Sequence, residues 1–531
     1  MNLDTFRRWL HVAPSLERAV TAAVTALVMA VVAWALVPAP PERPLDQLGG
    51  GLGAAPEPGV ADFTDTGPTT EGSLPTTADG SHSVGPSLPG DARGSSTAGG
   101  PGGTSSPGRG TTGGASGSSP PQRLTATDRG VTASAIKVGF AVIDWSGANS
   151  LGFFPEMRAD VSKAVDAMVD YANQRGGVLG RRIQPVKVTP DLTNEADQRQ
   201  KCLELTETHG VFAVMSAVAF PAQTATACIT TEHKTFLLSG NPGSSAHVRA
   251  GYPYDVAIFK DDNRKMRDLV SAASSNGFFD PAKGFRKLGV FVITCATTAH
   301  VDAPDGLKAY LREAGIKEWS EYRPECTAQG GQRSGPEAVL QFQQDGVTHV
   351  FIASNPPPAE ALVNAAGRAG FHPKWFVGDY FNLIVGPFTH KFHPEAFDGA
   401  LGVTQTHAGE GVVGKPLAPT TQTCSKILTD HGLAPISSAP PKDLGEDMEI
   451  LQLCEQFLLF LEVAKAAGPQ LTRSSWAAAL PTIGDFDGAL SDLSRFDRRG
   501  KTTGGDTMKL VTWKKDCTCF KELSGFRPAP G

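Results

Sequence analysis

Beyond residue 130, apolar residues follow two alternating patterns. Short apolar runs of strand length recur at 136–143, 183–188, 211–215, 236–238, 287–294, 349–353, 375–377 and 508–513. Between them, apolar residues return at helical spacing, as in 161–172, 305–314, 359–369 and 449–467. This alternation predicts parallel sheets covered by helices on both faces, so we expect an α/β fold. An interruption near 256–262 divides the pattern into two runs of similar length, which favours two lobes over one large sheet.

The first 37 residues have a different pattern. Residues 19–37 carry no charge, and a helix of that length spans roughly 28 Å, close to the thickness of a bilayer core. Three arginines precede this run, which favours a short cytoplasmic N-terminus at 1–18. We expect an uncleaved transmembrane signal anchor. The Ala-Trp-Ala sequence at 33–35 resembles a signal-peptidase site, so a cleaved signal peptide and a secreted protein remain the alternative.

Residues 38–125 are rich in Gly, Ser, Pro and Thr and contain almost no aromatic residue. Such a segment buries too little apolar surface to offset its ordering entropy, so we predict a disordered linker. Its root-mean-square reach of about 50 Å would hold the globular domain, 126–531, away from a membrane. A plain disordered tail is the alternative.

The net charge bears on the kind of partner, and the cysteine content bears on the cellular compartment. The net charge is −6, so nothing indicates a nucleic-acid partner. All eight cysteines lie in the globular part, which favours disulfides in an oxidising compartment over buried thiols. Helices that flank one strand can lie side by side, which predicts the pair Cys202–Cys228. The local pairs are Cys295–Cys326 and Cys424–Cys454, and elimination leaves Cys517–Cys519.

Loops that follow parallel strands are where such sheets form binding sites. These loops offer small hydroxyl groups, backbone N–H groups, aromatic rings and one carboxylate. That set suits a small polar ligand held by hydrogen bonds. The candidate ligand-binding residues are Trp145, Ser146, Ser216, Ala217, Ser239, Gly240, Asn241, His300, Asn355, Asp379 and Tyr380.

The segment 136–188 also carries a family resemblance. It has a strand with Ile-Lys-Val-Gly, a loop with Ser-Gly, a long helix, and then Gly-Gly-Val-Leu-Gly-Arg before the next strand. This resembles the start of the branched-chain amino-acid/amide family of extracytoplasmic solute-binding proteins of ABC transporters. The resemblance implies the type I periplasmic-binding fold, in which two lobes are joined by a three-strand hinge. Lobe 1 would comprise about 131–258 and 404–500, and lobe 2 about 259–403 and 501–531.

The resemblance also implies roles for some candidate residues. Ser216 stands where amino-acid binders contact the ligand carboxylate, and Gly240 and Asn241 where the next loop adds contacts. Asp379, or its neighbour Tyr380, stands where an acidic group meets the α-amino group. A carboxylate there would favour a cationic or donor-rich ligand. The family's two aromatic positions fall near His300 and Asn355, so the chain departs from the pattern for aliphatic amino acids.

Signals for an enzyme are weak. The sequence at 409–415 has the spacing of a phosphate loop, but Pro416 follows where the motif needs Ser or Thr. His390 and His393 lack the carboxylate pattern of a zinc protease, and we expect no metal or other cofactor. We therefore expect a monomeric, membrane-tethered protein that captures a small solute outside the cytoplasm for an ABC permease. A sensory or partner-binding ectodomain with the same fold is the second hypothesis.

Overall fold

The structure is a computed structural model that describes residues 123–145, 157–293, 295, 298–326, 328–385, 389–441, 443–498 and 500–530. The predicted anchor at 19–37, nearly all of the predicted linker and Ser146 lie outside these residues. Within the described part, no helix combines the length and the apolar character that crossing a membrane requires.

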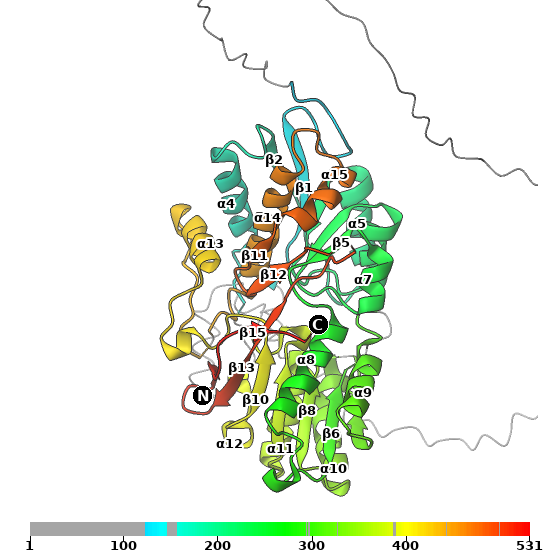
Figure 1. The fold of residues 1–531 in the computed structure, drawn as a ribbon, viewed down its shortest axis with the longest axis vertical. Coiled ribbons are helices and arrows are strands. Elements are labelled where there is room, and N and C mark those ends of the chain that lie inside the picture. The colour runs from blue at the N-terminus through cyan, green and yellow to red at the C-terminus, as the bar shows by residue number, and fades with distance from the viewer. Residues whose placement is uncertain are drawn as a thin grey trace, which may run out of the picture. The chain divides into compact units, whose positions relative to one another are not determined.

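The first sheet is built from the N-terminal part of the described chain. Its five strands are parallel and follow the order β2-β1-β3-β4-β5. Helices lie on both sides of it, with α4 and α14 on one side and α5 and α7 on the other (Figure 1). The strands are β1 (Ala135–Ala141), β2 (Arg182–Val188), β3 (Ala213–Met215), β4 (Phe236–Ser239) and β5 (Asp255–Ala257).

The second sheet follows the order β14-β13-β10-β9-β8-β6-β7, and β15 also pairs with β13. Strands β6 to β10 are parallel, whereas β13 runs antiparallel to both β10 and β14. The strands are β6 (Leu288–Val292), β7 (Trp319–Tyr322), β8 (His349–Ala353), β9 (Lys374–Gly378), β10 (Leu401–Thr404), β13 (Thr507–Lys514), β14 (Cys519–Glu522) and β15 (Arg527–Pro528). A separate two-stranded sheet pairs β11 (Asp485–Asp487) with β12 (Leu493–Arg495).

Side chains on the central strands alternate between two buried faces, as the pleat requires. On β6, Val290 and Val292 join one hydrophobic cluster, which contains α8 and α9 residues, while Phe291 joins the other, which contains α10 and α11 residues. Both faces are therefore covered, which explains why these strands read as continuous apolar runs rather than as alternating patterns.

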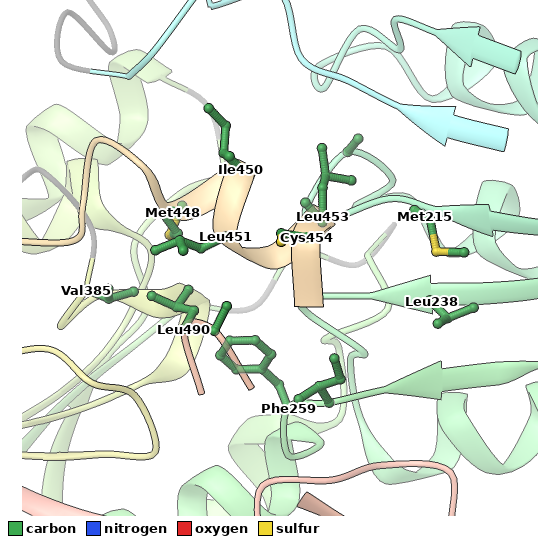
Figure 2. Close-up of a cluster of buried hydrophobic side chains, with 14 of the residues drawn as sticks. Met215, Leu238, Phe259, Val385, Met448, Ile450, Leu451, Leu453, Cys454 and Leu490 are labelled. Carbon is green, nitrogen blue, oxygen red and sulfur yellow. The ribbon is translucent and has the colours of Figure 1, made fainter. Parts of the chain in front are cut away.

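The helices have the apolar faces that the sequence predicts. The longest, α14, crowds Met448, Ile450, Leu451, Leu453 and Cys454 into a buried cluster (Figure 2). The helices are α4 (Val161–Gln174), α5 (Glu195–Leu203), α6 (Gln223–Ala227), α7 (Ser245–Gly251), α8 (Asp262–Ser275), α9 (Ala303–Glu313), α10 (Ala328–Gln344), α11 (Pro356–Arg368), α12 (Pro394–Phe397), α13 (Pro419–Asp430), α14 (Met448–Ala466) and α15 (Arg473–Ala479).

The four expected disulfides are present. Cys202 on α5 bonds Cys228 directly after α6, and Cys424 on α13 bonds Cys454 on α14. In the second sheet region, the pairs are Cys295–Cys326 and Cys517–Cys519. The pairings inferred from local position are therefore confirmed.

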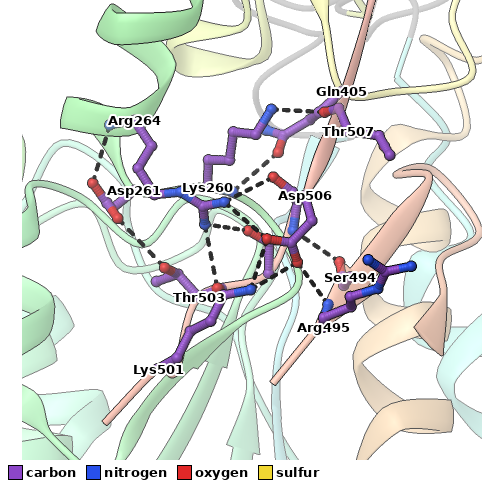
Figure 3. Close-up of polar contacts among 12 residues, drawn as sticks. Lys260, Asp261, Arg264, Gln405, Ser494, Arg495, Lys501, Thr503, Asp506 and Thr507 are labelled. Atoms are coloured by element: carbon purple, nitrogen blue, oxygen red, sulfur yellow. Dashed lines mark hydrogen bonds and ion pairs between the residues drawn. The ribbon is translucent and has the colours of Figure 1, made fainter. Parts of the chain in front are cut away.

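The chain passes three times between the two sheets: after β5, after β10 and before β13. The three crossings are bonded to one another (Figure 3). Backbone pairs join Ala257 to Thr502 and Gly504, and Thr406 pairs with Ser491. The Arg264 guanidinium donates to the carbonyls of 503–505 and pairs with Asp506.

Lys260 lies at the centre of these crossings and is almost fully buried. Its ammonium forms an ion pair with Asp268 and donates to the Thr507 carbonyl at 2.7 Å, while its backbone N–H donates to the Gln405 side chain. Burial lowers the pKa of Lys260 and raises the pKa of Asp268, and each charge offsets part of the other's shift. The ion pair and the carbonyl acceptor therefore offset part of the cost of burying both groups.

We expect Lys260→Met to reduce the free energy of unfolding by about 3 kcal/mol or more, because Asp268 is then left buried without a partner. The double variant Lys260→Met/Asp268→Leu should regain most of that loss. Chemical denaturation measures both. Lys426→Met, which breaks an exposed pair with Asp430, is the control and should cost under about 0.5 kcal/mol. Equal destabilisation in the single and double variants would contradict the assignment.

Candidate functional site

A cavity of about 210 Å³ opens where strand-end loops of the two sheets meet. The first sheet contributes residues that follow β1, β2, β3 and β4, and the second contributes those after β6, β8 and β9. The lining residues are Trp145, Met157, Leu192, Ser216, Ala217, Val218, Phe220, Pro221, Thr226, Leu237, Ser239, Asn241, Pro242, His247, Asp255, Ala299, His300, Asn355, Pro356, Pro357, Phe381, Asn382 and Met448.

Seven of the residues predicted from the sequence line this cavity: Trp145, Ser216, Ala217, Ser239, Asn241, His300 and Asn355. They come from strand-end loops far apart in the chain, which the parallel sheets bring together. Gly240, Asp379 and Tyr380 are not among the lining residues, and Ser146 lies outside the described part of the chain.

The expectation that Asp379 faces the ligand needs correction. Its carboxylate is buried and accepts hydrogen bonds from the Thr404 hydroxyl at 2.5 Å and the Gln405 backbone N–H at 2.7 Å. Burial raises the pKa of Asp379, and these two donors limit the rise. Asp379 thus bonds the end of β10 through Oδ2, and it is not among the residues that line the cavity.

Gly240 and Tyr380 support the cavity from behind. The Gly240 N–H donates to the Ala217 carbonyl at 2.7 Å, and a Cβ at this position would lie 2.5 Å from the Gln452 side chain. Tyr380 is buried, and its ring lies edge-on to His300 with centroids 6.0 Å apart. Gly240 and Tyr380 therefore contact residues that line the cavity but are not lining residues themselves.

A row of buried polar side chains on α14 bonds loops of the first sheet and the loop between β11 and β12. Gln456 accepts hydrogen bonds from the backbone N–H groups of Ser216 and Ala217, each at 3.2 Å. Glu455 accepts from three successive backbone N–H groups at 489–491. The N–H groups at 216, 217 and 240 are therefore already bonded within the protein.

Glu449 begins this row and fixes the aromatic wall of the cavity. Its carboxylate accepts hydrogen bonds from the Ile143 backbone N–H at 3.0 Å and from the Trp145 indole N–H. Burial raises the pKa of Glu449 to about 7, and the two donors limit that rise. Trp145 thereby covers the end of β1 with its ring against the cavity.

The loop at 298–300 connects the two halves of the cavity wall. The Ala299 carbonyl accepts from the Ser244 N–H at 2.8 Å, and Thr298 forms a bridge with Ala222. A Cβ on Gly243, which has φ +82°, would lie 2.6 Å from that carbonyl. Gly243 is required here because only glycine permits both this backbone conformation and this close approach.

His300, in the same loop, also bonds Asn241 of the loop after β4 and Asp262 on α8. Its Nε2 lies 3.0 Å from the Asn241 side-chain nitrogen, and its Nδ1 lies 2.6 Å from Asp262. Lys265 donates to Asn241 at 3.0 Å. Burial would raise the pKa of Asp262, but His300 and Lys265 hold it below its ordinary value. The charges near the cavity are thus paired within the protein.

The wall from the second sheet is largely apolar. Helix α11 begins with three successive prolines, Pro356 to Pro358, which remove N–H groups from its first turn. Phe381 and Asn382 adopt left-handed φ values of 52° and 56°, and Phe381 packs 4.5 Å from the His300 ring. Among the described residues that line the cavity, none is Lys or Arg.

Sequence reasoning missed several lining residues, among them Phe381, His247 and Asp255. The last two belong to elements that carry no motif, and only the packing of α6 and α7 over the first sheet brings them to the cavity. The metal-ligating atoms that cluster in the described residues are those of Cys202, Cys228 and His233, and both cysteines form a disulfide.

Glu449→Gln is expected to change the pH dependence of stability. Because the folded protein holds the Glu449 proton more tightly than the unfolded chain does, the free energy of unfolding falls as pH rises from about 4.5 to about 7. A glutamine cannot contribute to that fall. The wild type should therefore lose about 3 kcal/mol relative to the variant over this range.

Denaturation of both proteins at about pH 5 and about pH 8 checks this slope. Glu313→Gln, at the exposed end of α9, is the control and should parallel the wild type. Parallel slopes for Glu449→Gln and wild type would contradict the argument.

Comparisons with known proteins agree with this geometry. The family model described as periplasmic binding protein matches residues 135–518, and no curated protein matches the sequence. A similar solved structure is an ABC-transporter substrate-binding protein from Desulfitobacterium hafniense in complex with Leu. It is 16% identical, with a TM-score of 0.51, and the match covers 73% of this chain and 99% of that one.

Two further structures have the same fold. One is a solute-binding protein of an ABC transporter from R. palustris in complex with benzoate (16% identity, TM-score 0.53, 75% of this chain and 98% of that one). The other is a fatty acid ABC transporter substrate-binding protein from Thermomonospora curvata (15% identity, TM-score 0.53, 77% and 96%). With the family model spanning both sheets and the cavity between them, the chain belongs to the periplasmic binding protein family.

Proposed function

We propose that this protein captures a small, predominantly apolar organic solute in the cavity between its two sheets and presents it to an ABC-type permease. The observation that carries the proposal is the composition of the cavity. Trp145, Met157, Phe381 and the prolines of α11 form its walls, and none of its described lining residues is Lys or Arg. Such a lining favours solutes by burial of apolar surface, with a few polar groups that orient them.

The ligands named for the similar structures support this solute class. Leucine, benzoate and a fatty acid each join an apolar body to one polar end. In this chain the backbone N–H groups at 216, 217 and 240 are bonded internally. Side chains such as Ser216 and Asn355 are therefore the groups that we expect to orient the polar end.

We further propose that the solute favours a closed arrangement of two lobes around the three crossings. Contacts between the 298–300 loop and the loops at 221–222 and 241–244 would form on closure. A solute that touches both walls binds the closed arrangement better and so increases its population. The permease could then distinguish loaded from empty protein by shape.

The cellular setting is also a proposal. The uncharged run at 19–37 and the Gly/Ser/Pro/Thr-rich segment at 38–125 support a single-pass anchor with a long tether and an extracytoplasmic domain. The four disulfides support an oxidising compartment. The same tether also supports a second candidate, a ligand-sensing ectodomain. A permease encoded beside the protein would favour transport.

Native mass spectrometry of the purified globular domain, followed by calorimetry with the identified solute, tests the proposed function. We expect Phe381→Ala to weaken binding about 30-fold, which corresponds to about 2 kcal/mol for an apolar contact of this size. Leu340→Ala, at an exposed position on α10, is the control and should bind like the wild type. Undiminished binding by Phe381→Ala would place the solute elsewhere.

N-terminal sequencing of the protein from its native host tests the anchor. We expect the mature chain to retain residues 19–37, because this uncharged run continues beyond the Ala-Trp-Ala sequence at 33–35. A mature protein that begins at Leu36 would show cleavage and secretion instead.

A further inference from the structure

One corner of the cavity contains polar side chains that the loops at the strand ends do not supply. Thr226 lies on α6, His247 on α7 and Asp255 on β5, and all three line the cavity. Thr226 and His247 are bonded through Oγ1 and Nε2 at 2.9 Å. The same Nε2 lies 3.7 Å from the nearer oxygen of Asp255, too far for a good hydrogen bond.

Asp255 is the unusual member of this corner. It is 1% exposed, and its Oδ1 has no hydrogen-bond partner among the described residues. The Ser239 hydroxyl is likewise buried and without a partner there. Buried polar groups in native proteins are nearly always bonded, so two such groups lining one cavity point to a bond made by a ligand.

The strand register places these two groups on one surface. Leu237 pairs with Asp255 and Ser239 pairs with Ala257 in the parallel β4–β5 ladder. Residues that pair across such a ladder, and residues two apart on one strand, project from the same face. Asp255 and Ser239 therefore project from the same face of the sheet, together with Leu237, which also lines the cavity.

The corner is polar but uncharged at neutral pH. Burial raises the pKa of Asp255 to about 8, so its carboxyl group holds a proton. Burial, and then the nearby His300, lowers the pKa of His247 to about 4, so its imidazole is neutral. An anionic solute group would meet no opposite charge here, because none of the described lining residues is Lys or Arg.

We propose that Asp255, His247 and Ser239 form a polar subsite that receives a hydroxyl group at one end of the solute. A hydroxyl both donates and accepts hydrogen bonds through a single oxygen atom. It can accept from the Asp255 carboxyl and donate to the Ser239 hydroxyl, the two unpartnered groups on this face of the sheet. The inference rests on the proposed function and adds the chemical feature that selects one solute from others of similar size.

Phenol and toluene are the probes for this subsite, because they have nearly the same size and differ by one hydroxyl group. Calorimetric titration of each gives the ratio of their affinities for the wild type and for variants. In Asp255→Leu we expect the phenol-to-toluene ratio to fall about tenfold, the effect of one hydrogen bond. Asp255→Asn keeps an uncharged donor and acceptor and should hold the ratio within about threefold.

Two further variants secure the interpretation. Asp443→Asn is the matched control, because Asp443 is a buried carboxyl with a pKa raised to about 7 by burial, bonded to the Gly409 N–H outside the cavity. Its ratio should equal that of the wild type. Should Asp255→Leu fail to fold, Ser239→Ala replaces it, with an expected fall of about threefold. Thermal melts show whether each variant is folded.

The outcomes separate this inference from the proposed function. A fall in the ratio for Asp255→Leu, with none for Asp255→Asn, supports the subsite. Equal ratios in wild type and Asp255→Leu, with both probes bound, overturn the subsite and leave the solute-binding cavity intact. A fall of the same size in Asp255→Asn shows that a charge is required and overturns a hydroxyl ligand. Binding of neither probe to the wild type overturns both proposals.

Discussion

The buried polar face of α14 is the constraint on which the cavity depends. Parallel strands end in loops whose buried backbone N–H and C=O groups need hydrogen-bond partners. Glu449, Gln452 and Gln456 meet the loops after β1, β4 and β3 of the first sheet, and Glu455 meets the loop between β11 and β12. One rigid helix therefore sets the positions of loops that lie far apart in the sequence, and its apolar side anchors that helix in the core.

At the crossings between the sheets, charged side chains rather than neutral ones bond the backbone. Lys260 and Arg264 donate to backbone carbonyls, and Lys260 also pairs with Asp268, where three segments pass side by side. Asp379 joins them by holding the end of β10, two residues before Phe381 on the cavity wall. A change in the position of β10 would therefore be transmitted through Asp379 to Phe381 in the cavity wall.

Much of the fold could be predicted because its signals are local. The apolar run at 287–294, the helical spacing of 161–172 and the near-neighbour cysteines each describe structure within about thirty residues. Seven of the candidate residues line one cavity because parallel strands end on a common edge. Asp379 lies outside the cavity lining, which the sequence could not show. A carboxylate at a strand end gives the same sequence pattern whether it faces a ligand or a neighbouring strand. Asp255 and Glu449 were missed because sequence alone does not show which polar residues become buried.

The disulfides have a consequence for motion. Cys202–Cys228 and Cys424–Cys454 lie beside the first sheet, and Cys295–Cys326 and Cys517–Cys519 lie in the second, so none of the four links one sheet region to the other. The disulfides therefore constrain each sheet region separately and leave the three crossings without a covalent link between the regions.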